Sequence, residues 1–277
     1  MRRGPAFWLP VLVLCLWAIV ALTARLLPLT PNAIDLEYIL SGPGSDTLLG
    51  HDDLGRNVTD RLLVGARTSF LVAAWVVTLA LLTGTFIGTA SAYLGGWWDR
   101  ISVLLVDIFL AFPGILLAIA LAGLLGPGID NVVIALTVVG WVGYARLSRA
   151  QVLSLKHREH VQAAEALGTG QWTIMRRHLL PLMAAPLIIE ATFGIAAVVI
   201  AEAGLSFLGL GVQPPQASWG AMIRDGTRYM LVAPHMVLAP GIALFAVVLS
   251  VNLLGDRLRD RLNIRLTNNR PANNKVE

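Results

Sequence analysis

Residues 160–182 read HVQAAEALGTGQWTIMRRHLLPL, a polar segment set between two long hydrophobic stretches. Its first part is rich in alanine and favours a helix. Gly168 and Gly170 then interrupt the helix, and a second polar stretch leads to Pro181, which suits the first turn of a following helix. A charged segment of this kind between membrane helices predicts a rigid docking element for another protein. A connector that lies passively on the membrane surface is the alternative.

The composition indicates a membrane protein. Of 277 residues, 56% are hydrophobic and only 14% are charged, which is too apolar for an ordinary soluble domain. The net charge of +4 does not indicate nucleic-acid binding, because the basic residues flank hydrophobic stretches and form no stripe with aromatic residues. Cys15 is the only cysteine, which excludes a disulfide framework and a cysteine metal cluster and leaves a packing role.

Six apolar segments approach the roughly 20 residues that a helix needs to cross a bilayer. We expect spans at residues 7–27, 70–94, 101–125, 132–150, 182–205 and 236–254. The first could instead be a signal peptide, since Arg2 and Arg3 precede it, but its apolar run is long and no clear cleavage site follows. We therefore expect an all-α integral membrane protein.

The distribution of lysine and arginine predicts the orientation, because cytoplasmic loops carry the excess of positive charge. With the N-terminus inside, 15 of the 21 basic residues lie at the cytoplasmic face and 6 at the outer face. An even number of spans returns the C-terminus to the cytoplasm, so both termini and residues 160–182 are expected inside. The inner set is Arg2, Arg3, Arg100, Arg146, Arg149, Lys156, Arg158, Arg176, Arg177, Arg257, Arg259, Arg261, Arg265, Arg270 and Lys275, and the outer set is Arg25, Arg56, Arg61, Arg67, Arg224 and Arg228.

Three separated blocks carry a family resemblance. They are LGHDDLGRNV at residues 49–58, the polar segment with its Gln-Ala-Ala and Leu-Pro at fixed spacing, and GLSFLGLGVQPP at residues 204–215. On these blocks the chain resembles the second permease of the dipeptide, oligopeptide and nickel group of binding-protein-dependent ATP-binding-cassette (ABC) importers. The resemblance implies residues 1–69 as a first helix and external segment, 70–260 as the core permease domain with a coupling loop at 155–181, and 261–277 as a cytoplasmic tail.

The resemblance also implies partners and a fold: the type I ABC importer permease fold with six helices and a cytoplasmic coupling helix. The expected partners are a homologous permease, two cytoplasmic ATPases and an external solute-binding protein in the bacterial inner membrane. The residues implied in ATPase coupling are Gln162, Ala163, Ala164, Glu165, Gly168, His178, Leu180 and Pro181.

Two positions depart from the family pattern. Gln162 stands where the family has glutamate, and His178 stands where it has an aliphatic residue. Glutamine keeps hydrogen-bonding capacity and loses the charge, which puts an ion pair to the ATPase in doubt at this position. Glu165, on the same helical face, could supply that charge.

Nucleotide chemistry is not expected in this chain. A phosphate-binding P-loop needs Gly-Lys-Ser or Gly-Lys-Thr, but Lys156 follows Leu155 and Lys275 follows Asn274. ATP and Mg²⁺ are therefore expected on partner subunits, and the chain is expected not to be an enzyme. His157 and His160 could share a metal, but a solvated polar face is the favoured interpretation.

Ionisable residues inside membrane spans are costly and usually face the protein interior or a path. Asp107, Glu190 and Glu202 are therefore the candidates for lining the translocation path. The alternatives are structural: Asp107 could pair with Arg146 or Arg149, and Glu202 could reach the outer interface.

Small residues and a proline give packing expectations. The stripe of Ala80, Gly84, Gly88 and Ala92 predicts close helix packing, either inside the subunit or with a partner. Pro113 and Gly114 interrupt the third span, where we favour a kink over a working hinge.

The outer segments and the substrate leave alternatives open. Residues 30–60 and 206–229 could be passive interfacial anchors, or they could shape the mouth that receives a binding protein, as the resemblance implies. Peptides are the favoured substrate over nickel or a metal chelate, because His51 and His235 are too few and too far apart in sequence to indicate nickel. An ion-driven secondary transporter and a membrane scaffold are the alternatives from other classes.

Overall fold

The computed structural model describes residues 5–44 and 47–268. Arg2, Arg3, Arg270 and Lys275, which enter the orientation count, lie outside these described residues, as does the 269–277 part of the tail. Within them the chain is helical, with a single isolated β-bridge between His51 and Asn57. The elements are α1 (Pro5–Thr23), η1 (Leu36–Tyr38), α2 (Val58–Leu94), α3 (Gly96–Leu110), α4 (Gly114–Leu125), α5 (Ile129–Leu155), α6 (Glu159–Ala166), α7 (Gln171–Thr173), the π-helix η2 (Ile174–Leu179), α8 (Leu180–Phe207), α9 (Trp219–Thr227) and α10 (His235–Asn268).

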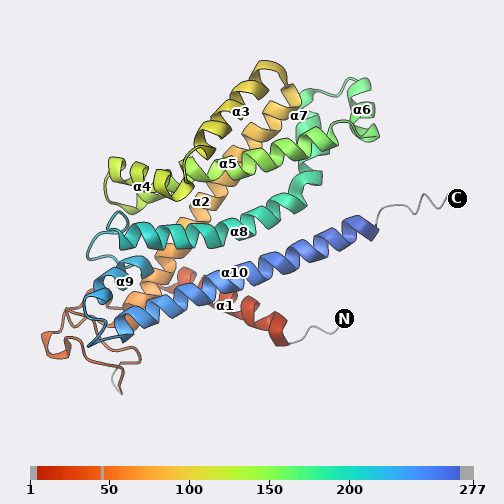
Figure 1. Cartoon of the computed structure of the whole chain (residues 1–277). Coiled ribbons are helices and arrows are strands. Elements are labelled where there is room, and N and C mark those ends of the chain that lie inside the picture. The colour runs from red at the N-terminus through yellow and green to blue at the C-terminus, as the bar shows by residue number, and fades with distance from the viewer. Residues whose placement is uncertain (1–4, 45–46, 269–277) are drawn as a thin grey trace.

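The long helices run between two ends of the molecule (Figure 1). One end carries α6, the start of α1 and the end of α10, and we refer to it as the α6 end. The other carries α9 and the irregular segment that precedes α2, and we refer to it as the α9 end. The start of α1 and the end of α10 therefore lie on the same side of the bundle as the polar segment.

Four helices of the described chain are long and apolar enough to cross a membrane: Val58–Leu94, Ile129–Leu155, Gln171–Phe207 and His235–Leu262. A fifth is added if α3 and α4 together count as one broken span. The apolar part of α1, Trp8–Thr23, is shorter than these. The six similar spans expected from the sequence are therefore four long helices, a broken pair and a shorter helix.

The second span begins earlier than expected. We expect it from residue 70, but α2 starts at Val58. The Asn57 side chain caps this start by accepting hydrogen bonds from Thr59 N at 2.8 Å and Asp60 N at 3.4 Å. Residues 58–69 are therefore helix and not part of the irregular external segment, because an N-cap outweighs the polarity of these first turns.

The third span differs most from its expectation. Residues 101–125 do not form one kinked helix, because α3 and α4 meet at 88°. Pro113 lacks a backbone N–H and disfavours helical geometry at the residue before it, so α3 ends at Leu110 and α4 starts at Gly114. The sequence locates the break correctly, and the structure gives its size, which the sequence does not predict.

The small-residue stripe of α2 packs inside the subunit. A Cβ added at Gly84 would meet the backbone oxygen of Trp141, and one added at Gly88 would meet that of Ala145. A Cβ added at Gly140 would lie 3.4 Å from the Cβ of Ala80. The two helices α2 and α5 therefore approach each other closely, and at Gly84 and Gly88 their backbones nearly touch. Of the two packing roles expected for the stripe, the structure shows the internal one.

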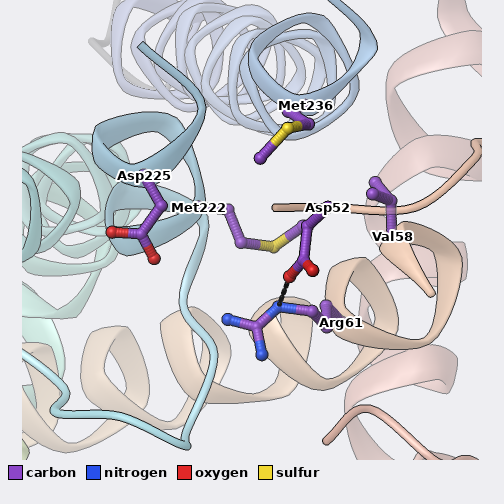
Figure 2. A pocket seen from close by; sticks show the side chains of 6 residues that line it. All are labelled: Asp52, Val58, Arg61, Met222, Asp225 and Met236. Carbon is purple, nitrogen blue, oxygen red and sulfur yellow. Dashed lines mark ion pairs between the residues drawn. The ribbon is translucent and has the colours of Figure 1, made fainter. Parts of the chain in front are cut away.

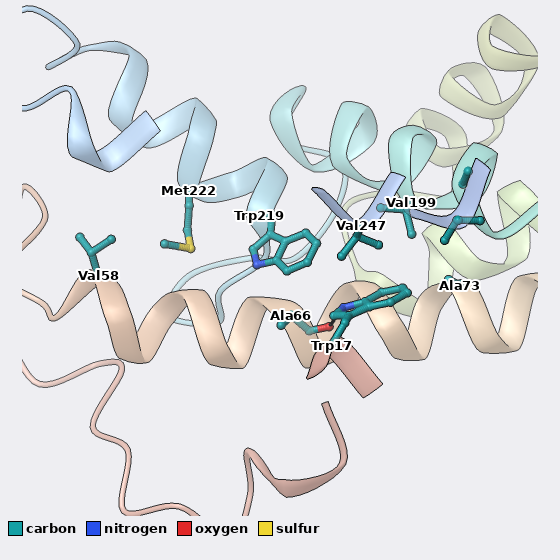
Figure 3. Packing of buried hydrophobic residues seen from close by; sticks show 10 residues of the cluster. Trp17, Val58, Ala66, Ala73, Val199, Trp219, Met222 and Val247 are labelled. Carbon is teal, nitrogen blue, oxygen red and sulfur yellow. Dashed lines mark hydrogen bonds between the residues drawn. The ribbon is translucent and has the colours of Figure 1, made fainter. Parts of the chain in front are cut away.

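An aromatic core joins five helices at the α9 end. Trp17 of α1 and Trp219 of α9 are 7% and 2% exposed, and their ring centroids lie 6.3 Å apart (Figure 3). Both indole nitrogens donate hydrogen bonds to α2, Trp17 to Ala66 O at 3.0 Å and Trp219 to Leu62 O at 3.1 Å. Residues of α8 and α10 complete the cluster, so this end is held by contacts far apart in sequence.

Candidate functional site

The helix α6 rests on the protein by one face only. Val161 is 0% exposed and packs with Ile174 and Leu179 of η2 in one buried cluster. Ala164, one turn along, is also buried, whereas Gln162 and Glu165 are exposed. The apolar positions of this helix therefore anchor it, and its polar positions face outward.

The helix ends in a well-defined turn at Gly168. Gly168 has φ +78°, a left-handed conformation that strains residues with a Cβ. Its N–H donates to Glu165 O at 2.9 Å, and Thr169 N–H donates to Ala164 O at 3.0 Å. These two bonds form a Schellman motif, which satisfies carbonyls at the helix end and sets the direction of the following chain. The expected interruption at Gly168 is confirmed.

The polar segment then runs into the next membrane helix with no loop between them. Residues Gln171–Phe207 form one continuous helical element, which begins well before residue 182. Its second part, η2, is a π-helix, and Pro181 follows in the first turn of α8. Because Pro181 has no N–H, it cannot form the α-helical bond to Arg177 O, which favours the wider π-type turn there. Pro181 therefore suits the first turn of α8, as expected, but the helix has already begun before it.

The surface of this region mixes polar and apolar side chains. Leu167 is 86% exposed and Trp172 is 59% exposed, close in sequence to the exposed Glu165. Ala163, Gly168, Leu180 and Pro181 are exposed as well, and His178 is half-buried. Large apolar side chains beside a carboxylate on a projecting helix are typical of a protein-docking surface. The coupling roles of these residues stay predictions.

Glu202, one of the three path candidates, lies inside the subunit. Glu202 is only 2% exposed. Its carboxylate accepts hydrogen bonds from Ser69 Oγ at 2.8 Å and from Ser206 Oγ at 2.7 Å. These bonds connect α8 to α2 and satisfy the buried carboxylate. Glu202 therefore faces the interior of the bundle and not its exposed surface.

The other two candidates, Asp107 and Glu190, are exposed on α3 and α8. Asp107 does not pair with Arg149, because Arg149 binds Asp99 through two bonds, Nε to Oδ1 at 2.7 Å and the second nitrogen to Oδ2 at 2.8 Å. Of the two expected structural partners of Asp107, Arg149 is therefore wrong, and Arg146 lines the same cavity as Asp107. A path role for all three carboxylates stays a prediction.

The block at residues 49–58 folds into a buried ionic cluster at the α9 end. The Asp52 carboxylate lies 2.7 Å from Arg56 Nε. It also lies 3.4 Å from Arg61 Nε, as Figure 2 shows. It also accepts the backbone N–H groups of Leu54 at 3.0 Å and Arg56 at 2.9 Å. Asp225 of α9 lines the same small cavity. One carboxylate thus holds the segment before α2 and the start of α2 together, beside α9.

The structure also brings together two histidines that sequence reasoning keeps apart. His235 Nε2 lies 3.0 Å from the backbone oxygen of His51, and His51 Nδ1 lies 2.7 Å from Ser41 Oγ. The His235 bond fastens α10 to the segment before α2, and the His51 bond lies within that segment. Across residues 5–44 and 47–268, no group of three or more His, Cys, Asp or Glu side chains is placed to hold a metal ion. No signal in the sequence indicates the contact between the two histidines.

Comparison with protein families and curated proteins gives consistent results. The sequence model described as "Binding-protein-dependent transport system inner membrane component" matches residues 80–268. The glutathione transport system permease protein GsiD of Pectobacterium atrosepticum is 39% identical over 267 residues, which cover 96% of this chain and 89% of that protein. The protein of the same name from Escherichia coli O1:K1 is 40% identical over 235 residues, 85% of this chain and 78% of that protein.

Solved structures support the fold. A chain of the inward-facing MetNI methionine ABC transporter superposes with a TM-score of 0.57 at 21% identity, over 72% of this chain and 95% of that one. A second crystal form of the same transporter gives a TM-score of 0.55 at 19% identity. At this identity the likeness concerns the fold alone, and the helical fold class expected from the sequence is confirmed.

Proposed function

Because the chain belongs to the family of binding-protein-dependent transport system inner membrane components, and is thus a multi-pass permease of an ABC importer, we propose that it imports small peptides. The support for the substrate class is the name shared by two relatives at 39% and 40% identity, glutathione transport system permease. Glutathione is itself a short peptide with a free amino group and free carboxylates. The relatives thus favour peptides over the nickel alternative.

The observation that carries the mechanism is the single-faced anchoring of α6. Val161 and Ala164 hold the helix on the bundle, while Gln162, Glu165 and Leu167 face outward. An ATPase that binds this outward surface would move α6, and the continuous helix Gln171–Phe207 would carry that movement into the membrane. We propose two ATPase subunits as the docked partners, which bind the ATP and Mg²⁺, and a homologous permease as the other half of the path.

This arrangement needs the α6 end in the cytoplasm. The proposed orientation places both termini there, in agreement with the excess of lysine and arginine in the segments on that side. The α9 end then faces outward, where its external segment and α9 offer a surface to a solute-binding protein. The proposed subunit performs no covalent chemistry.

The test is reconstitution of the permease pair, its ATPases and its binding protein in liposomes. We expect ATP-dependent uptake of radiolabelled glutathione or dialanine and no uptake of Ni²⁺ by the same complex. Uptake driven by an ion gradient without the ATPases would contradict the proposal and support a secondary transporter. No uptake of any solute by a correctly assembled complex would favour a scaffold.

The docking surface has its own test in Glu165→Gln. Removing the charge should weaken co-purification of the ATPase by up to about fivefold, the effect of one exposed ion pair. Glu159→Gln is the matched control, because Glu159 is an exposed glutamate in the first turn of the same helix. Equal ATPase yields for both variants would remove Glu165 from the docking surface.

A further inference from the structure

The exposed side of α5 forms a strip between α3 and α8. Gly143 and Arg146, one turn apart, are exposed while Tyr144 and Ala145 between them are buried against the bundle. Glu190 of α8 borders this strip, since its Oε1 would lie 3.5 Å from a Cβ placed at Gly143. On the other side, Asp107 of α3 and Arg146 line a common cavity of about 160 Å³.

The three charged side chains also lie at the same depth in the bundle. Lys156 Nζ donates to Ala92 O at 3.4 Å, so the α2–α3 junction and the end of α5 meet at the α6 end. Counted from there, Arg146 is nine residues before the end of α5, Glu190 ten after the start of α8, and Asp107 eleven after the start of α3. At a rise of 1.5 Å per residue, all three lie about 14–17 Å along the helix axis from these three points.

Lipid cannot cover this strip at low cost. An ionised side chain in a spanning helix costs about 2.5–3.5 kcal/mol on insertion scales, so such groups face a partner, a cavity or water. Within the described residues, the side chains of Asp107, Arg146 and Glu190 take part in no hydrogen bond or ion pair with the rest of the chain. In contrast, the buried Glu202 and the Arg149–Asp99 pair are fully engaged within the subunit. These three charged side chains are therefore available to bind a group from outside the subunit.

We propose that Asp107, Arg146 and Glu190 form a polar binding station for a zwitterionic solute on the path-facing side of this subunit. The proposal rests on peptide import. The two carboxylates attract a free ammonium group, and the guanidinium of Arg146 binds a carboxylate with paired N–H donors. A peptide with free termini carries both charges. Arg146 is thus a path residue that the sequence assigns only to the cytoplasmic count of positive charge.

The first experiment asks whether the strip faces water in the assembled importer. In a Cys15→Ala background, Asp107→Cys, Arg146→Cys and Glu190→Cys are treated with a quaternary-ammonium methanethiosulfonate reagent, which attacks thiolates in water. We expect modification at least about tenfold faster than for Phe245→Cys, because a thiol in lipid ionises poorly. Phe245 is a suitable control because it is 64% exposed on the apolar side of α10.

Equally slow modification of all four variants in an intact complex would mean that the partner permease covers the strip, and it would overturn the proposal. Labelling needs no transported solute, so its result does not depend on peptide import. The parental complex in the uptake assay tests peptide import separately.

The second experiment tests whether the charged side chains of the strip contribute to solute transport. Arg146→Gln should lower ATP-dependent uptake of dialanine about tenfold, while Arg146→Lys, which keeps the charge but not the paired N–H donors, should keep only part of the uptake. Co-purification of the partners checks that each variant complex is assembled. Parental uptake by Arg146→Gln, Glu190→Gln and Asp107→Asn alike would overturn the proposal. So would full recovery in a variant with the charges of Asp107 and Arg146 exchanged, since that would indicate a structural ion pair.

Discussion

The two ends of this permease are built in opposite ways. At the α9 end, Asp52 ties the segment before α2 to the start of α2, and the indoles of Trp17 and Trp219 connect segments distant in sequence through hydrogen bonds. At the α6 end, α6 is a short helix that rests on η2 by Val161 and Ala164 and leaves its other face free. The difference teaches that the α9 end is suited to serve as a fixed frame, and that α6, held by one face, is the element suited to move against it.

The largest expected effect is a loss of stability when the ionic cluster at the α9 end is removed. Asp52→Ala removes the common partner of Arg56 and Arg61, whose side chains are only 9% and 4% exposed. Leaving buried guanidinium groups without their carboxylate should cost about 3–5 kcal/mol of stability. Thermal unfolding of the purified protein, followed by tryptophan fluorescence, measures the loss.

Asp256→Ala is the matched control for that variant. Asp256 also pairs with an arginine, Arg259 at 3.3 Å, but both side chains are more than half exposed, at 52% and 54%. We expect a change below about 1 kcal/mol. Equal losses in the two variants would show that the α9 end is no more tightly held than an exposed helix surface.

A smaller effect is expected at the movable end from Gly168→Ala. The left-handed φ of +78° makes a Cβ costly by about 1–2 kcal/mol, although no atom lies within 4 Å of it. Opening of the Schellman turn should speed hydrogen exchange at the Gly168 and Thr169 amides about tenfold, and coupling to the ATPase should weaken. Global thermal stability should hardly change.

Gly170→Ala is the control that separates the effect of backbone strain at Gly168 from the effect of adding a methyl group to this turn. Gly170 has an equally open surrounding but φ −61°, which suits any residue. Parental exchange and transport are expected for this variant. If Gly170→Ala impaired coupling as much as Gly168→Ala, the turn geometry would not be the cause.

The smallest expected effect concerns pH at the fixed end. Burial raises the pKa of Asp53, the adjacent Asp52 carboxylate raises it further, and Arg56 opposes them. Because the folded pKa lies above the unfolded one, the stabilising contribution is present below about pH 4 and is lost as pH rises through the folded pKa. Asp53→Asn should therefore unfold at a slightly higher temperature than the parent at pH 7 and at the same temperature near pH 4. A lower unfolding temperature at pH 7 would show that the ion pair with Arg56 outweighs burial.

The sequence predicts what local chemistry determines. Apolar length predicts the helical class and most spans, Gly168 predicts the end of α6, and Pro113 predicts the position of the break in the third span. Each of these depends on residues close together in the chain. The small-residue stripe predicts close packing as well, but its partner helix, α5, emerges only from the structure.

What the sequence does not predict depends on distant contacts. The 88° between α3 and α4 is set by packing around the break and not by Pro113 alone. The burial of Glu202 depends on Ser69, which is 133 positions away, so its charge alone suggests a path residue. Arg149 likewise binds Asp99, 50 positions away, and not Asp107.

The unbroken helix from Gln171 to Phe207 has a mechanical consequence. Its 37 residues follow about 55 Å of helix axis, well beyond the roughly 30 Å of a hydrocarbon core, and they include the π-helix η2 and Pro186, which interrupt regular α-helical geometry. If this helix turns as one body about the α9 end, a tilt of about 5° displaces Gln171 by up to about 5 Å. In such a rotation, a displacement imposed at Gln171 reaches Glu190 with a smaller amplitude and a larger force, because Glu190 lies nearer the pivot.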